Sequence, residues 1–367
     1  MANNQTEVLK KTDTKDGIRA AAPKRVLCLL SNYAGNGGIH RFNRNLVEAI
    51  RQQPGAVCTV LTLNDAGAVG PYRGAGGSKA LFLARILWQF LSGKPDLLVV
   101  GLLNFAPLAL FGRMSTGVRT VCILHGFEAW YRRGNLAPFY RYIDAFWAVS
   151  QYTRQTFSRT NGVASDRVAP IFNTIPSDWD GGSVPLRREP YFLSITRLDK
   201  GEGYKGIDKS IQAIGRLQDR MRALGWEYRL IAHGDDLERH RRLAADLGVS
   251  DLVRIRSGVT DEELKALYAQ CGFFLLPSSG EGFGIVFLEA MAYRKACIGS
   301  LGCGTTDVIS HGVSGFLIDP TPDTIEDAVS RLMEDPERCA EMGEAGYRRL
   351  QDTFSFPRFA ARIAELT

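Results

Sequence analysis

The chain has no uninterrupted apolar stretch long enough to cross a bilayer. A transmembrane helix needs about 18 or more consecutive apolar residues. The longest candidate, Leu97 to Phe111, is interrupted by Asn104 and Pro107. The first residues of the chain are polar and contain no apolar signal core, which argues against secretion. We therefore expect a cytoplasmic protein without a membrane span.

Paired cysteines and metal-ligand spacings are also missing. The seven cysteines are scattered, their number is odd, and no two form a CxxC pair. This pattern predicts reduced thiols rather than a disulfide framework or a zinc site. The adjacent acids Asp235 and Asp236 follow a predicted strand, but no third ligand lies at a suitable spacing. We interpret them as part of a turn and expect no metal.

A dinucleotide fingerprint is incomplete. The loop after the first predicted strand contains Gly35, Gly37 and Gly38, but the pattern G-x-G-x-x-G would need glycine where the chain has His40. The spacing thus argues against NAD. The glycines still allow a ligand to approach the backbone closely.

Charge is divided unevenly along the chain. Residues 1–170 hold 21 Lys and Arg against 9 Asp and Glu, whereas residues 171–367 hold 24 against 30. A basic half of this kind is typical of a protein that meets a polyanionic surface, either an anionic membrane leaflet or nucleic acid. A basic face that only keeps the protein soluble is the alternative.

Short apolar runs alternate with helical patterns in both halves of the chain. A length of 367 residues with 45% hydrophobic content predicts two domains at roughly 150 residues each. Alternating strands and helices predict α/β domains built on parallel sheets. The runs predicted as strands are 25–30, 56–63, 96–101, 119–124 and 145–149 in the first half, and 191–195, 228–232, 253–255, 273–276 and 296–298 in the second.

Composition also sets the expected boundaries. Residues 1–22 are polar and lack periodicity, which indicates a disordered tail. Residues 177–190 are rich in Gly, Pro, Ser and charge, as in a linker. The two domains are therefore expected over 23–176 and 191–352. In doubly wound sheets ligands bind beyond the carboxyl ends of strands, so the loops after strands are where a site is expected.

The stretch from Glu281 to Ala292 is the most informative of these loops. Glu281 and Glu289 lie eight positions apart and bracket two glycines and a short apolar run. The run from Ile285 onward predicts a helix that begins at the glycines, which places free N–H groups and the positive end of the helix dipole near Gly284. Such a helix start binds phosphate. The local pattern fits a buried helix with Glu281 in solvent equally well.

Two other loops carry side chains suited to a charged ligand. Arg197 and Lys205, after the first strand of the second half, supply two cations for a diphosphate. His125 directly follows the strand 119–124, where an imidazole can polarise a substrate oxygen or steady a charged leaving group. A histidine satisfied within the core is the alternative.

Together these motifs resemble the retaining glycosyltransferases of family 4, which have the GT-B fold. The residues that carry the resemblance are Gly37-Gly38, His125-Gly126, Arg197, Lys205-Gly206-Ile207-Asp208, Pro277-Ser278 and Glu281 to Ala292. Its most specific element is the glutamate pair within E-G-F-G-x-V-x-x-E-A-M-A. The resemblance implies two Rossmann-like domains that face each other across a cleft. It also implies that residues 353–367 form a helix crossing back to the first domain.

The resemblance implies roles for individual residues. The donor phosphates would be held by Arg197, Lys205, the amides of Phe283, Gly284 and Ile285, and, from the opposite domain, Gly37 or Gly38. Glu289 would accept hydrogen bonds from the ribose hydroxyls, and Glu281 would contact the transferred sugar. His125 would contact the sugar or the leaving phosphate, and Val259 would lie near the base. No metal ion or other cofactor is implied beside the nucleotide sugar.

Three departures from the family pattern concern the donor sugar more than the fold. The spacing from Arg197 to Lys205 is longer than usual, which makes Lys200 a rival for the phosphate role. Arg294-Lys295 replaces the usual glycine after the glutamate helix. The stretch 302–307 reads G-C-G-T-T-D where many members have Gly-Gly and then glutamate.

The predicted function is retaining transfer of a hexose from a UDP- or GDP-linked sugar to a hydroxyl of a glycan or lipid-linked acceptor. The apolar stretch 81–91, near Lys79 and Lys94, resembles an interfacial helix that could rest on an anionic membrane surface. A core helix is the alternative there. The rival functions are a nucleoside-diphosphate-sugar epimerase and a non-catalytic sugar-nucleotide-binding protein. Nucleic acid is not expected as a partner.

Overall fold

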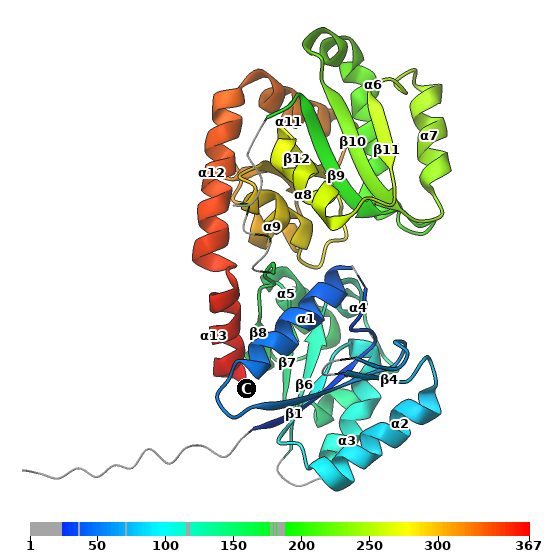
Figure 1. Cartoon of the computed structure of the whole chain (residues 1–367), viewed down its shortest axis with the longest axis vertical. Coiled ribbons are helices and arrows are strands. Elements are labelled where there is room, and N and C mark those ends of the chain that lie inside the picture. The colour runs from blue at the N-terminus through cyan, green and yellow to red at the C-terminus, as the bar shows by residue number, and fades with distance from the viewer. Residues whose placement is uncertain are drawn as a thin grey trace, which may run out of the picture.

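The computed structural model describes residues 24–35, 37–69, 72–114, 118–176, 179, 181 and 188–367. The described chain forms two α/β domains, one above the other in Figure 1. The predicted tail 1–22 and most of the predicted linker 177–190 lie outside the described residues.

The first domain is built on a sheet of eight strands within the described residues. Their order is β3-β4-β2-β1-β5-β6-β7-β8, and neighbours are parallel except for β3 with β4. The strands are β1 Arg25–Leu30, β2 Val57–Thr62, β3 Ala68–Val69, β4 Tyr72–Gly74, β5 Leu97–Val100, β6 Arg119–Leu124, β7 Ala145–Ala148 and β8 Val168–Pro170. All of β5 is buried, as expected for a parallel strand covered on both faces.

The helices of the first domain follow the apolar periodicity of the sequence. Phe42, Leu46 and Ile50 recur at spacings of four on α1 and are all buried, so this face packs on the sheet. The described helices are α1 Gly38–Arg51, α2 Lys79–Trp88, α3 Ala109–Met114, α4 Phe127–Trp130 and α5 Gln151–Asn161, with short turns η1 Gln89–Gly93, η2 Leu103–Leu108, η3 Ala137–Tyr142 and η4 Ser165–Arg167.

The second domain is built on a parallel sheet of six strands, all of them in the described region 188–367. Their order is β11-β10-β9-β12-β13-β14. The strands are β9 Tyr191–Arg197, β10 Glu227–His233, β11 Val253–Arg256, β12 Phe273–Leu276, β13 Ala296–Ser300 and β14 Gly315–Ile318. The helices are η6 Gly203–Lys205, α6 Ile207–Leu224, α7 Leu237–Asp246, α8 Asp261–Gln270, α9 Ile285–Ala292, α10 Thr305–Val308, α11 Pro322–Glu334, α12 Pro336–Thr353 and α13 Phe356–Leu366.

The last two helices link the domains. Helix α12 packs on α9 and β13 of the second domain, and α13 packs on α1 of the first. In Figure 1 they form one long run along the side of both domains. The Phe359 ring of α13 lies 5.9 Å from that of Phe42, and the Arg362 Nε donates to the Pro170 carbonyl oxygen at 3.4 Å. The final helix is therefore anchored on the first domain.

Three aromatic rings form an apolar junction between the domains. The ring of Phe172, which follows β8, stacks on that of Phe283 with a centroid distance of 6.2 Å. Phe354, between α12 and α13, meets both rings edge-on, at 5.7 Å and 5.6 Å. Burial of this cluster holds the domains together beside the loop that leads to α9.

The predicted pair of parallel-sheet α/β domains is confirmed. The strands β3, β4, β8 and β14 were not predicted. The first three have only two or three residues, which carry too little periodicity to indicate a strand, whereas β14 is as long as β5 and β12, which were predicted. Arg197 is the last residue of β9 rather than a loop residue. The predicted boundaries of the tail, the two domains, the linker and the final helix stay predictions. None of the described helices is long and apolar enough to span a membrane.

Candidate active site

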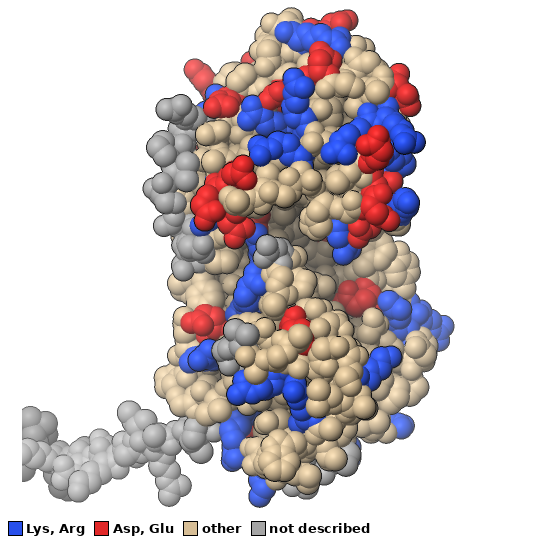
Figure 2. Space-filling model, turned by 45° about the vertical axis from the view of Figure 1, so that its right-hand side comes forward, with Lys and Arg blue, Asp and Glu red and all other residues tan. Residues whose placement is uncertain are grey.

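The predicted site loops meet where the two domains face each other. The loop after β6 begins with His125, and the loop after β12 contains Glu281 and leads into α9. Helices α1 and α9 begin close together, since a Cβ built on Gly38 would lie 3.8 Å from Cγ2 of Ile285. The molecular surface is hollowed between the two domains (Figure 2). Both sheets therefore direct strand-following loops toward one junction, where ligands of such sheets bind.

The start of α9 requires glycine. Gly284 precedes the helix with a φ of 93°, a conformation that side chains with a Cβ rarely adopt. A Cβ there would also lie 2.6 Å from the Phe287 ring. The first turn of α9 contains no acidic residue that would occupy the helix start in place of an anion. Ile285, Leu288 and Met291 are buried, so α9 is a core helix whose start is suited to an anion.

His125 is held in one tautomer at the end of β6. Its Nε2 lies 3.0 Å from the Gly101 carbonyl oxygen, and because that oxygen only accepts, Nε2 carries the proton. Burial lowers the pKa of His125, although the nearby Glu128 carboxylate and the bond to Gly101 act in the opposite direction. The ring is therefore neutral near pH 7, with Nδ1 as an acceptor. It is better suited to bind a sugar hydroxyl than to stabilise negative charge.

The backbones of the His125 and Glu281 loops touch. A Cβ built on Gly282 would lie 1.8 Å from the carbonyl oxygen of His125, and one built on Gly126 would lie 2.6 Å from Cα of Gly282. Real Cβ atoms essentially never come closer than 3.0 Å. Glycine at both positions is therefore what lets the two domains approach this closely.

Glu281 forms an ion pair with Lys205. The Lys205 Nζ lies 2.7 Å from Oε1 of Glu281, and both side chains are largely buried. Burial acts to lower the pKa of Lys205, but Glu281 raises it on balance, so the ammonium stays charged. The backbone N–H of Gly304 donates to the Glu281 carbonyl oxygen at 2.7 Å and fixes the loop. The structure thus brings together the predicted sugar-contacting acid and one predicted phosphate cation.

Arg197 is paired elsewhere. Its guanidinium donates to Glu202, with Nε 3.0 Å from Oε2, and Nε also lies 3.2 Å from Asp199. These acids raise the pKa of Arg197, with the hydrogen bonds to Glu202 as the main cause. The side chain is 56% exposed. Among the described contacts, none joins Arg197 to α9. Lys200, the rival for the phosphate role, is exposed, and its backbone N–H donates to Asp235 at 2.9 Å.

Glu289 lies on α9 with only 1% of its side chain exposed, and both domains supply its partners. The Tyr268 hydroxyl of α8 donates to Oε2 at 2.8 Å, and Oε1 is paired with Arg41 of α1. The Arg41 guanidinium also lies over the ring of Trp179, 4.8 Å from its centroid. The second glutamate is therefore bound across the domain junction.

The remaining predicted residues lie at the edges of this arrangement. Gly37 precedes α1, and its N–H donates to His40 Nδ1 at 3.2 Å. Phe283 is buried in the aromatic junction, which leaves its backbone for a ligand. Val259 is partly buried and precedes Thr260, whose hydroxyl caps α8. No described contact links Val259 to the other predicted residues.

Four residues at the site were missed in the sequence analysis. Arg41 and Tyr268 pair with Glu289, Glu202 holds Arg197, and Asp307 accepts from the Tyr152 backbone N–H across the junction at 3.2 Å. Arg41 lies one turn after Gly38 on the same helix, and this was its one local signal. Glu202 lies five residues after Arg197, and Asp307 ends the stretch 302–307 that departs from the family pattern. Tyr268 becomes a neighbour of Glu289 through folding alone.

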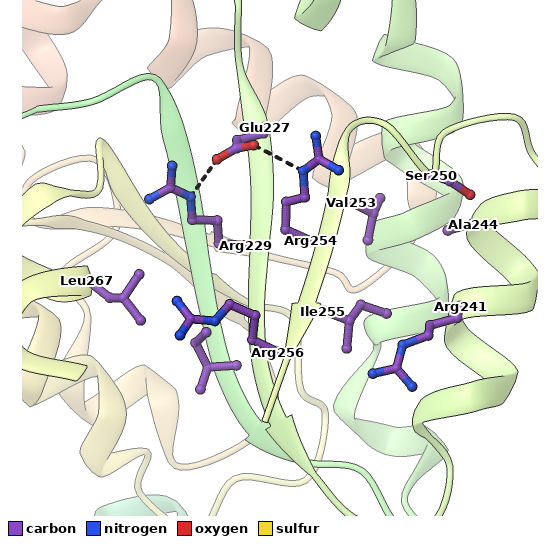
Figure 3. Close-up of a pocket in the computed structure, with 11 residues that line it drawn as sticks. Glu227, Arg229, Arg241, Ala244, Ser250, Val253, Arg254, Ile255, Arg256 and Leu267 are labelled. Atoms are coloured by element: carbon purple, nitrogen blue, oxygen red, sulfur yellow. Dashed lines mark hydrogen bonds and ion pairs between the residues drawn. The ribbon is translucent and has the colours of Figure 1, made fainter. Parts of the chain in front are cut away.

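An arginine-lined pocket lies away from the junction. It encloses about 510 Å³ and is formed by β10, β11 and nearby residues. In Figure 3 Arg229 and Arg254 flank Glu227 and are joined to it, and Arg256 pairs with Glu263. Carboxylates therefore offset these cations, and no predicted site residue lines the pocket. Among the described residues there is no group of three or more His, Cys, Asp and Glu placed to hold a metal ion.

Two protein-family models match the chain: Glycosyltransferase Family 4 over residues 36–179 and Glycosyl transferases group 1 over residues 182–349. A GDP-mannose-dependent alpha-(1-6)-phosphatidylinositol monomannoside mannosyltransferase of Mycolicibacterium smegmatis is 32% identical over 298 residues, which are 75% of this chain and 78% of that protein. The human alpha-1,3/1,6-mannosyltransferase ALG2 is 28% identical over 60% of this chain and 57% of its own.

Solved structures share the fold at low sequence identity. Sucrose-phosphate synthase from Thermosynechococcus elongatus superposes with a TM-score of 0.77 at 17% identity, over 94% of this chain and 98% of its own. Anabaena HepE in complex with UDP and glucose superposes with a TM-score of 0.75 at 17% identity, over 93% and 98%. Fold and site define a two-domain α/β transferase. The chain belongs to the GT-B glycosyltransferases of group 1 and family 4. The predicted class of reaction, glycosyl transfer, is confirmed.

Proposed function

We propose that this glycosyltransferase moves a hexose from a GDP- or UDP-linked sugar to a hydroxyl of a lipid-linked or cell-surface glycan precursor, with retained anomeric configuration and without a metal ion. The observation that carries the proposal is the meeting of the Lys205–Glu281 pair, the His125 loop and the start of α9 at one junction. One of the named relatives is a GDP-mannose-dependent mannosyltransferase, so GDP-mannose is the first donor to test.

The junction supports stabilisation of a diphosphate leaving group. Lys205 and the amides at the start of α9 face the developing negative charge. Arg197 adds a second cation when its exposed side chain turns from Glu202 to the phosphates. The bond from the anomeric carbon to the phosphate oxygen breaks as the acceptor oxygen attacks from the same face. The departing phosphate takes the acceptor proton, while His125 and Glu281 bind the sugar.

A panel of nucleotide sugars tests the reaction. With GDP-mannose, UDP-glucose and related donors, we expect release of the nucleoside diphosphate from one donor, slowly without acceptor and faster with it. NMR of the product should show the donor's anomeric configuration, and excess EDTA should leave the rate unchanged. An inverted product contradicts retention. A rate lost in EDTA and restored by a divalent ion contradicts metal independence. Epimerised free sugar nucleotide would instead support the rival function.

Two substitutions test the donor site. Glu289→Ala and Arg197→Ala should each weaken binding of the nucleoside diphosphate at least tenfold, roughly the effect of losing one charge-assisted hydrogen bond. Arg254→Ala is the matched control, because Arg254 is also 56% exposed and pairs with a glutamate on the same sheet. Calorimetric titration with GDP and UDP provides the measurement. Wild-type affinity in both site variants would contradict the assignment of Glu289 and Arg197 to the donor site.

An exposed apolar surface on α2 and η1 supports an acceptor held at a membrane. It is formed by Leu81, Leu83, Leu87, Trp88 and Leu91, and we call it the α2 patch. Trp88 is 65% and Leu91 68% exposed, whereas isolated exposed apolar residues are more usual in soluble proteins. Helix α2 lies at the end of the first domain away from the second (Figure 1), next to the exposed Lys79 and Lys94. We infer peripheral binding to the inner face of the cell membrane from the cytoplasm.

Liposome flotation tests the α2 patch. We expect the wild-type protein to float with vesicles that contain anionic lipid. The Trp88→Ser/Leu91→Ser double variant should stay unbound. Leu301→Ser with Val313→Ser is the control, since these two residues are also exposed but lie in the second domain. The inference is refuted if both double variants float equally well. It is also refuted if the wild-type protein does not float at low salt.

A further inference from the structure

The surroundings of Glu289 include a charge from the opposite domain. Glu289 belongs to α9 of the second domain, whereas Arg41 belongs to α1 of the first, and the two are paired with 1% and 11% of their side chains exposed. A buried carboxylate is stable only with a partner that compensates its charge. Tyr268 supplies one hydrogen bond, at 2.8 Å, and burial raises the pKa of its phenol, so it remains a donor. The compensating positive charge comes from Arg41.

Arg41 is itself held in place. Its guanidinium lies 4.8 Å from the Trp179 ring centroid, a cation–π contact that limits its motion. Its helix begins at Gly38, and a Cβ built on Gly38 would lie 3.8 Å from Cγ2 of Ile285 in α9. Helices α1 and α9 are therefore in contact twice, at their starts and through the Arg41–Glu289 pair.

The pair leaves acceptor positions on the carboxylate for a ligand. Two carboxylate oxygens offer about four acceptor positions. The Tyr268 hydroxyl occupies one on Oε2, and Arg41 faces Oε1. About two positions remain, as many as the two neighbouring hydroxyls of a ribose need. Arg41 and a ribose are thus compatible partners of Glu289 rather than competitors.

We propose that Arg41 is a positioning residue for donor binding, which orients Glu289 from the opposite domain so that the nucleotide-holding carboxylate is complete only when the domains are together. The proposal rests on the proposed role of Glu289 in holding the ribose. It makes nucleotide binding and domain closure linked equilibria, since each favours the arrangement that the other needs. Loss of Arg41 leaves Glu289 buried with Tyr268 as its remaining described donor.

The experiment compares Arg41→Gln, Arg41→Lys, Glu289→Gln and the Arg41→Gln/Glu289→Gln double variant in the full chain. Calorimetry gives the Kd for GDP and UDP, and steady-state assays separate KM from kcat. We expect Arg41→Gln to raise the Kd and the donor KM by about 5- to 150-fold, the usual range of coupling between sites, with a smaller effect on kcat. Arg41→Lys should recover part of the affinity. The double variant should bind no more weakly than Glu289→Gln, because Arg41 acts through Glu289.

Arg51→Gln is the matched control, since Arg51 is exposed in the last turn of the same helix. Melting curves identify any variant that fails to fold, and Arg41→Lys then carries the test. Affinity within twofold of wild type, or tighter, in Arg41→Gln overturns the proposal, as does additive weakening in the double variant. If Glu289→Gln also binds normally, the donor site itself is wrong. If Glu289→Gln binds weakly and Arg41→Gln does not, only the role of Arg41 fails.

Discussion

Replacing Gly282 with alanine tests whether catalysis needs the two domains in contact. The new Cβ would lie 1.8 Å from the His125 carbonyl oxygen, whereas real Cβ atoms essentially never approach closer than 3.0 Å. The two loops must therefore part by at least about 1.2 Å, the difference between these distances. Misplacement by about 1 Å can cost roughly a hundredfold in rate, or about 2.7 kcal/mol of transition-state stabilisation. We expect a fall of that size in kcat/KM.

The stability of Gly282→Ala should change little, because the clashing atom belongs to the other domain. Each domain can keep its own core while the junction opens. Gly134→Ala is the matched control, since a Cβ at Gly134 would have no neighbour within 4 Å and its φ is not positive. The assay is nucleoside diphosphate release with the donor found in the panel, alongside melting curves. A kcat/KM within threefold of wild type in Gly282→Ala would refute the reasoning that the loops must touch.

Three further substitutions have defined outcomes. Tyr268→Phe removes the hydrogen bond to the buried Glu289 and should weaken nucleotide binding about tenfold, the scale of a bond to a charged group, as titration can measure. Burial raises the pKa of Asp307, so its charge costs stability once the pH rises above the unfolded value near 4; Asp307→Asn should melt higher than wild type at pH 7, and the difference should vanish in acid. Hydrogen bonds, chiefly from His240, hold the pKa of Asp208 well below its usual range; Asp208→Asn should melt lower at pH 7, and this difference should disappear as the pH falls below about 4 and through the depressed pKa. An opposite sign in either melting series contradicts the cause given for it.

Local patterns were sufficient to predict much of the fold and the start of α9. The buried β5 is a continuous apolar run, and α1 shows its helical period in Phe42, Leu46 and Ile50, so neighbours in the sequence carry the signal. Gly284 precedes α9 as predicted, because the left-handed backbone there depends on one residue type. Such features depend on a few consecutive residues and can be derived from one sequence.

The partners of the predicted side chains could not be predicted from the sequence. Arg41 and Glu289 are 248 positions apart, and no local pattern indicates which of many arginines reaches a given acid. The sequence likewise does not show that Arg197 pairs with Glu202. The protonation of His125 depends on its burial and on Gly101, both of which are set by packing. Residue types were therefore predictable, whereas charge states and pairings needed the folded chain.

The helices at the junction close a circuit. Helix α9 packs on α12, α12 runs on into α13, and α13 packs on α1, whose start at Gly38 returns to the start of α9 at Ile285. If these four helices stay rigid, none of them can rotate unless the chain bends at a joint between two of them. We expect the short break at Phe354 and Ser355, between α12 and α13, to be that joint. Opening of the domains would then bend the chain there while the starts of α1 and α9 separate. A distance probe across that break would show whether the domains close when the sugar nucleotide binds.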